Sequence, residues 1–198
     1  MIHIGYHNCH ATQAVRKIMR DGNKNMRVFF ALWPDDAGRR ALTDWQSPLV
    51  KLCGGKAMRP ETMHNTLVFL GNVAVDRLEA LVLVAQETAG TAFNLRFDEA
   101  RYWRHNHIVY AVPGEVPVQL TQLVQSLQQH LRRHRFSFDQ REYKPHVTLL
   151  RHANCNGAPL SEMPAFAWPV HDFVLVQSLS DENGARYQVL ARFPLHKS

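Results

Sequence analysis

Cysteine is scarce in this chain, and its cysteines do not form closely spaced pairs. Cys9, Cys53 and Cys155 are the three cysteines of the 198 residues, and no two of them make a Cys-x-x-Cys pair. An odd number of widely separated cysteines argues against a disulfide framework and against a zinc ribbon. We therefore expect a reducing compartment, and the cytoplasm is the predicted location.

Long hydrophobic runs are also lacking. No stretch reaches the roughly 20 apolar residues that a membrane-spanning helix needs. The N-terminus also lacks the apolar segment of about 7–15 residues that marks a signal peptide. We expect no membrane partner. The hydrophobic content of 45% is enough for one compact domain with a substantial core.

An excess of positive charge is present but is unevenly distributed. Lys and Arg number 23 against 17 Asp and Glu, a formal charge of +6. Four of the basic residues precede Met26 and outweigh Asp21 there, namely Arg16, Lys17, Arg20 and Lys24. The remainder is only mildly basic, which suits a polyanionic partner without identifying one.

Residues 1–25 do not resemble the start of a fold, because the first strongly apolar run begins only after Met26. We interpret 1–25 as an N-terminal extension, disordered or non-native, with Met26 as the functional start. Residues 26–198 then form a single bilobal domain. An alternative for the extension is a metal site made of His3, His7, Cys9 and His10.

Hydrophobic periodicity predicts alternating strands and helices of the α+β class, internally duplicated. Apolar side chains at helical spacing predict helices at 37–52, 75–89 and 118–134. Short apolar or alternating runs predict strands at 28–32, 62–70, 93–97, 107–112, 146–151, 170–178 and 187–193. Gly71-Asn72 is expected to close the second strand, and Asp181–Gly184 to form a hairpin turn.

The tetrapeptide His-x-Thr-Leu occurs twice, as His64-Asn65-Thr66-Leu67 and as His146-Val147-Thr148-Leu149. The composition predicts only about 0.05 copies by chance, so two copies indicate a shared function. They lie 146 − 64 = 82 residues apart. This spacing predicts two similar lobes that each contribute one histidine.

Residues two apart in a strand share a face, so each histidine projects beside the threonine of its motif. Two facing imidazoles can act as a general base and a general acid without a metal, which is the chemistry of cyclic phosphodiester cleavage. The alternatives are half-buried structural histidines or a zinc site. Neither motif carries an adjacent Asp, Glu or Cys ligand, which argues against zinc.

Three segments carry a resemblance to a known family. They are Arg27-Val28-Phe29-Phe30-Ala31-Leu32-Trp33-Pro34, His64-Asn65-Thr66-Leu67-Val68-Phe69-Leu70-Gly71 and Lys144-Pro145-His146-Val147-Thr148-Leu149-Leu150-Arg151. Over residues 26–195 the chain resembles the two-histidine (2H) phosphoesterases, and among them the bacterial RNA 2′,3′-cyclic phosphodiesterases, also called LigT-like 2′-5′ RNA ligases. The resemblance implies a bilobal α+β fold, with two pseudo-symmetric lobes whose antiparallel sheets line a central cleft and whose helices lie outside.

The resemblance also implies a reaction, in which a 2′,3′-cyclic phosphate at an RNA 3′ end opens to a 2′-phosphomonoester. His64 would be the proton donor to the leaving 3′-oxygen, and His146 the proton acceptor that activates water. In a 2′-5′ ligase reaction a 5′-hydroxyl would replace the water. Thr66, Thr148 and Arg151 would hold the nonbridging oxygens. The implied partner is RNA, tRNA fragments included, and the implied enzyme is a monomer with no cofactor and no metal.

Several further residues are candidates for binding RNA. Strict alternation sends Arg151 to the face opposite His146, unless the strand ends, twists or bulges there. Base stacking is open to five aromatic residues, of which we select Phe30 and Tyr143: Phe30, Trp33, Tyr102, Trp103 and Tyr143. Each of these is more often a core or rim residue. Arg141 and Lys144 could attract the RNA backbone or be solvated charges. The rival functions are a phosphodiesterase for a small non-RNA cyclic phosphate and a non-catalytic RNA-binding module.

Overall fold

The structure is a computed structural model that describes residues 24–155, 157, 160, 163–181 and 184–197. The expected extension therefore lies outside the described residues, apart from Lys24 and Asn25, and so does its candidate metal site. The first strand begins at Asn25, one residue before Met26. The division into an extension and a domain stays a prediction.

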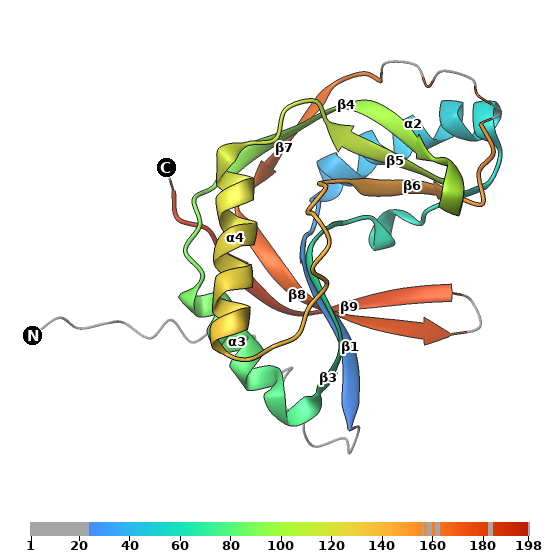
Figure 1. The fold of residues 1–198 in the computed structure, drawn as a ribbon. Coiled ribbons are helices and arrows are strands. Elements are labelled where there is room, and N and C mark those ends of the chain that lie inside the picture. The colour runs from blue at the N-terminus through green and yellow to red at the C-terminus, as the bar shows by residue number, and fades with distance from the viewer. Residues whose placement is uncertain (1–23, 156, 158–159, 161–162, 182–183, 198) are drawn as a thin grey trace, which may run out of the picture.

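Two antiparallel sheets make up the fold (Figure 1). The four-stranded sheet has the order β3 (Asn65–Ala74), β1 (Asn25–Leu32), β8 (Asp172–Asp181) and β9 (Gly184–Pro194). The five-stranded sheet has the order β2 (Lys56–Ala57), β6 (Val147–Arg151), β5 (Ile108–Pro113), β4 (Phe93–Trp103) and β7 (Phe166–Val170). The motif strands β3 and β6 belong to different sheets, which confirms the predicted two-lobed α+β architecture.

Within the described residues, three helices cover the sheets: α2 (Asp36–Cys53), α3 (Leu78–Glu87) and α4 (Val118–Arg133). Short 3₁₀ turns occur at Pro60–Thr62, Val75–Arg77 and Arg104–Asn106. Helix α2 packs on β6 and β7, whereas α3 and α4 pack on each other and against β9 and β3. Each lobe is thus assembled from both halves of the chain, rather than from one half each. No described helix combines the length and hydrophobicity that crossing a bilayer requires.

Strand β1 carries apolar side chains on both faces, and each face packs against a different apolar cluster. Val28, Phe30 and Leu32 enter the main core, and Phe30 is fully buried against Phe173 and Phe193. The predicted role of Phe30 in binding RNA is therefore wrong. Its neighbour Phe29 lies on the opposite face, which carries a second apolar cluster made of Phe29, Ala31, Trp33, Val174 and Val176.

Several predicted boundaries need correction. Gly71 and Asn72 do not end β3, which runs on to Ala74. Gly71 instead adopts φ = 73° beside a register shift against β1, a conformation that glycine tolerates without strain. Strands β2 and β7 were not predicted. β7 contains Pro169 and lies at a sheet edge, where a missing backbone N–H costs no ladder bond. Residues 182–183 of the expected hairpin turn lie outside the described ranges, between the paired strands β8 and β9.

Cys53 and Cys155 form a disulfide across 102 residues of sequence, so the expectation of no disulfide is wrong for this pair. The pairing of β2 with β6, in which Lys56 lies opposite Arg151, brings their segments together. The Asn154 N–H also donates to the Cys53 carbonyl (2.8 Å). Tertiary pairing of this kind leaves no signature in cysteine spacing.

Candidate active site

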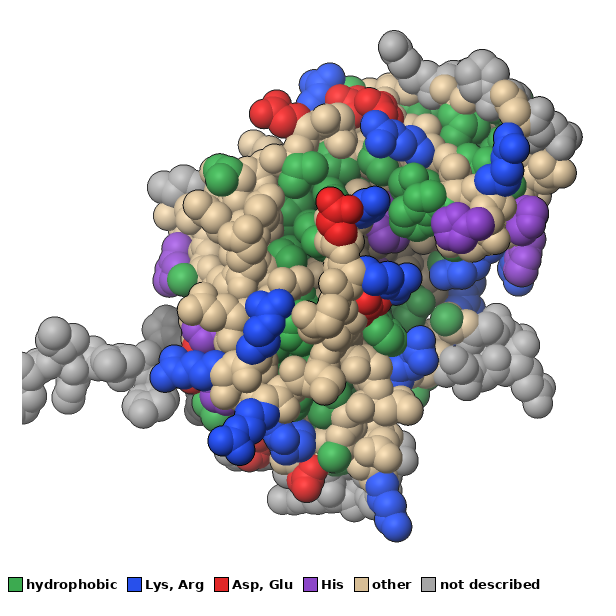
Figure 2. Space-filling view, viewed as in Figure 1, with side chains coloured by type: hydrophobic (Ala, Val, Ile, Leu, Met, Phe, Trp, Pro, Cys, Tyr) green, Lys and Arg blue, Asp and Glu red, His purple; other side chains and the backbone are tan. Residues whose placement is uncertain are grey.

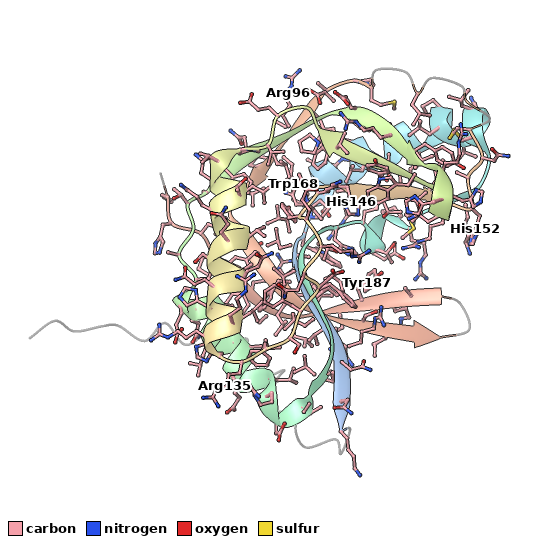
Figure 3. The ribbon with its side chains drawn as sticks, in the orientation of Figure 1. Arg96, Arg135, His146, His152, Trp168 and Tyr187 are labelled. Carbon is pink, nitrogen blue, oxygen red and sulfur yellow. A yellow bond between two sulfur atoms is a disulfide. The ribbon has the colours of Figure 1, made fainter. Side chains whose placement is uncertain are left out.

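Both motif histidines face one cavity of about 200 Å³ between the sheets. His64 directly precedes β3 and His146 directly precedes β6, so each lobe supplies one ring. Figure 3 labels His146 on one side of this space and Tyr187, from β9, on the other. The lining consists of Arg27, Phe29, Met58, Thr62, His64, Thr66, Phe69, His146, Thr148, Arg151, Ser178 and Tyr187. The motif threonines thus lie where the sequence predicts, and their contacts with substrate stay a proposal.

The two imidazoles are held in the same way. His64 Nδ1 lies 2.8 Å from the Thr62 carbonyl oxygen, and His146 Nδ1 lies 2.7 Å from the Lys144 carbonyl oxygen. A carbonyl only accepts, so both Nδ1 atoms are protonated and donate. Each neutral ring is left with its lone pair on Nε2. The two rings can therefore take up or release a proton only at Nε2.

The surroundings of His64 are strongly aromatic. Its ring stacks on Trp33 at a centroid distance of 5.5 Å, lies 4.8 Å from Phe29 and meets Tyr187 edge-on at 4.9 Å. The pKa of His64 is lowered to about 4, mainly by burial and to a smaller extent by the nearby charges of His146 and Arg151, against the hydrogen bond to the Thr62 carbonyl, which raises it. The protonated His64 is therefore a strong acid.

The ring of His146 contacts fewer aromatic side chains than the ring of His64. Its ring meets Trp103 edge-on at 4.7 Å and Tyr110 at 5.8 Å. Burial lowers the pKa of His146, opposed by the hydrogen bond to the Lys144 carbonyl. Both histidines are thus neutral in the unliganded protein at pH 7.

A β-bulge follows each motif threonine and has the same form in both lobes. Thr66 pairs with Ala31 and Val68 with Phe30, so Leu67 is an extra residue against β1. Thr148 pairs with Tyr110 and Leu150 with Val109, so Leu149 is an extra residue against β5. An extra residue reverses the alternation of the side chains that follow it.

The second bulge explains how Arg151 comes to line the cavity. Arg151 lies five positions after His146, and the extra residue Leu149 returns Arg151 to the face of Thr148. The Leu149 carbonyl accepts from the Met58 N–H (2.8 Å) and from Gln46 Nε2 (3.0 Å). These two bonds hold the bulge against α2 and the chain entering the first motif. Arg151 is exposed at the end of β6 with its side chain in the site.

A larger cavity of about 530 Å³ adjoins the first and shares Thr66, Phe69 and His146 with it. The candidate Tyr143 lines this cavity, and its hydroxyl donates to Asn65 Oδ1 (3.1 Å). Trp103 also lines it. Tyr102 lines neither cavity and donates to the Ala153 carbonyl.

The two candidate cations beside the larger cavity are paired with carboxylates. Lys144 contacts Glu142 at 3.3 Å, and Arg141 pairs with Asp139. All four residues line the larger cavity, so its charges balance locally. Figure 2 shows Lys and Arg side chains spread over this face with hydrophobic side chains between them.

Sequence reasoning missed Arg27, Phe29, Ser178 and Tyr187 as parts of the site. The alternation of Arg27, Phe29, Ala31 and Trp33 shows that these four share a face, yet it does not show which face meets His64. Tyr187 and Ser178 come from β9 and β8. They reach this face because β8 pairs with β1 and β9 pairs with β8, which is a tertiary feature. Among the described residues, no three His, Cys, Asp or Glu side chains gather as metal ligands do.

Comparison with known proteins decides the family. The family model of the 2′-5′ RNA ligase superfamily matches residues 33–182. The chain belongs to this superfamily.

Its relatives share most of its length. The RNA 2′,3′-cyclic phosphodiesterase of Escherichia coli K12 is 30% identical over 171 residues, covering 85% of this chain and 96% of the relative. The Thermus thermophilus protein of the same name is 27% identical over 183 residues, covering 86% and 90%. The crystal structure of E. coli LigT in its apo form superposes with a TM-score of 0.78 at 27% identity, covering 88% of this chain and 99% of LigT. This superfamily member therefore has the LigT fold.

Proposed function

We propose that this protein is an RNA 2′,3′-cyclic phosphodiesterase that leaves a 2′-phosphomonoester, with 2′-5′ ligation as the related reaction. The observation that carries the proposal is the matched pair of Nε2 atoms facing a cavity that also holds Thr66, Thr148 and Arg151. Relatives named for this activity support it, as does a structure of E. coli LigT complexed with 3′-AMP. The proposed substrates are RNA 3′ ends, including those of tRNA fragments. The cytoplasm is proposed as the location on the ground of this RNA substrate, since the Cys53–Cys155 disulfide removes the argument from cysteine usage. One chain supplies the whole cavity, so a monomer is the proposed active form.

In the proposed mechanism the two rings work at opposite ends of an in-line displacement. His146 Nε2 takes a proton from water as the water oxygen bonds to phosphorus. The bond from phosphorus to the 3′-oxygen breaks, and His64 Nε2–H protonates that oxygen. The products are a 3′-hydroxyl and a 2′-phosphomonoester. A 5′-hydroxyl in place of water gives a 2′-5′ linkage by the same transfers.

Arg151 and the threonines would act on the phosphoryl group. The guanidinium stabilises the negative charge that gathers on the nonbridging oxygens in the transition state. The hydroxyls of Thr66 and Thr148 donate to the same oxygens. The bound anion also offsets the positive charge of Arg151 near His64, which favours protonation of that ring.

The depressed pKa values predict an acidic optimum for kcat/KM. Activity falls at low pH once His146 is protonated, and it falls at higher pH once His64 loses its proton. Both pKa values lie below the usual 6.5, with that of His64 at about 4. The bell-shaped profile should therefore already decline above pH 6.5. Steady-state rates on a dinucleotide 2′,3′-cyclic phosphate measure it, and kcat/KM still rising through pH 7.5 would contradict the assignment.

A turnover assay with identified products tests the proposed function. The full chain is incubated, in EDTA, with a short oligoribonucleotide that ends in a 2′,3′-cyclic phosphate, and ³¹P NMR assigns the product. We expect multiple turnovers to a 2′-phosphate. A 3′-phosphate product would refute the assigned leaving group. Binding without turnover would instead indicate an RNA-binding module, and cleavage of only small non-RNA cyclic phosphates would indicate the other rival.

A further inference from the structure

We propose that Arg27 binds the phosphodiester that precedes the terminal nucleotide, so that the site selects oligoribonucleotides over mononucleotide cyclic phosphates. This inference rests on the proposed function and names a second phosphate subsite within it.

The two lobes differ at one equivalent position of the site. Each motif threonine is followed by a bulged leucine, and the third residue after the threonine then returns to the cavity. In β6 that residue is Arg151, and in β3 it is Phe69. Both line the cavity. The lobe of His64 therefore lacks a cation at the position where the lobe of His146 has one.

Arg27 supplies a cation to the lobe of His64 from the neighbouring strand. Its guanidinium carbon lies 4.7 Å from the centroid of the Phe69 ring. Stacking on an aromatic face holds the planar guanidinium while leaving its N–H groups free to donate at the edge. Arg27 is exposed and lines the cavity with both histidines. The Phe69 ring is thus a platform for Arg27.

The two arginines of the cavity differ in how they are placed relative to His64, the proposed proton donor. The charge of Arg151 acts on His64 directly. Arg27 lies beyond two rings, because the contacts run from His64 to Phe29 (4.8 Å), from Phe29 to Phe69 (6.5 Å) and from Phe69 to Arg27. We therefore assign Arg151 to the cyclic phosphate that reacts, and Arg27 to a phosphate group of the ligand that lies farther from His64.

Charge in the cavity matches a ligand with two phosphates. Its described lining contains no Asp or Glu, and none of the ion pairs found among the described residues involves Arg27 or Arg151. By contrast, Arg141 and Lys144 at the larger cavity are paired. A mononucleotide 2′,3′-cyclic phosphate carries one negative charge, whereas a dinucleotide carries two. The second guanidinium therefore matches the phosphodiester one nucleotide upstream.

The experiment compares kcat/KM for adenosine 2′,3′-cyclic phosphate with kcat/KM for the adenylyl-adenosine dinucleotide bearing the same end. In Arg27→Gln the ratio of dinucleotide to mononucleotide should fall roughly tenfold or more. Phe69→Leu, which removes the platform, should lower the ratio in the same direction. Arg151→Gln should lower both rates together and leave the ratio unchanged. Arg96→Gln, at an exposed strand residue far from His146 (Figure 3), is the matched control.

The salt dependence of KM gives a second test, which does not require the Phe69→Leu variant. The slope of log KM for the dinucleotide against log salt should be smaller by about one in Arg27→Gln than in the wild type. An unchanged ratio and an unchanged slope in Arg27→Gln would overturn the subsite while leaving the phosphodiesterase intact. A wild-type chain that turns over neither substrate would overturn the proposed function itself, and the subsite with it.

Discussion

Replacing His64 or His146 by alanine should lower kcat/KM on a dinucleotide 2′,3′-cyclic phosphate by roughly 10²- to 10⁴-fold. The reason is that each ring has its own proton transfer to make, and the described lining of the cavity holds no third histidine and no carboxylate. Each Nε2 is presented by a hydrogen bond from Nδ1 to a carbonyl oxygen. Steady-state kinetics of both variants measures the loss.

A control separates this loss from damage to the fold. His171→Ala removes an exposed histidine between β7 and β8, and its kinetics should match those of the wild type. Circular dichroism and Tm should show that both motif variants are folded. If either folded variant kept kcat/KM within threefold of the wild type, its histidine would have no part in proton transfer.

Replacing Arg151 by glutamine should lower kcat roughly 10²-fold, because the cavity then loses the arginine whose charge acts on His64. Removing one donor to a developing oxyanion typically costs about 10²–10³ in kcat. Arg151→Lys should recover part of the rate, since it restores the charge without the planar fork. The kinetics of both variants with saturating dinucleotide measure the effect on kcat.

Because Arg151 is exposed, its replacement should affect catalysis without affecting the stability of the fold. Its side chain leaves the end of β6, so Tm should change little in either variant. An Arg151→Gln protein with normal kcat and a raised KM would show that the guanidinium binds ground state and transition state equally. That result would remove Arg151 from the transition state and leave it as a binding residue.

Much of the fold could be predicted from local patterns. The stripe Leu120, Leu123, Val124, Leu127 and Leu131 is buried along α4 as its helical spacing predicts. The duplicated His-x-Thr-Leu predicted that two rings from two lobes would meet, and they share one cavity. These features could be predicted because periodicity and motif composition are properties of the local sequence.

The features that sequence could not supply are set by tertiary pairing. Both Phe29 and Phe30 are apolar, so only the position of β1 between β3 and β8 decides which of them meets His64. The place of Arg151 depends on a bulge against β5, and the disulfide depends on β2 pairing with β6. Arg27 lines the cavity and contacts the ring of Phe69, which lies on the neighbouring strand β3. None of these contacts is encoded within a short window of sequence.

The two histidines are assigned different proton transfers, and a change of leaving group separates these two roles. The substrate is a dinucleotide 2′,3′-cyclic phosphate in which sulfur replaces the 3′-oxygen. A thiol ionises near pH 8.5 and leaves as a thiolate without needing a proton. His64→Ala should then cleave this substrate within about tenfold of the wild-type rate, while His146→Ala keeps its full defect. Equal losses in the two variants, or rescue of His146→Ala instead, would contradict the assignment of His64 as the acid.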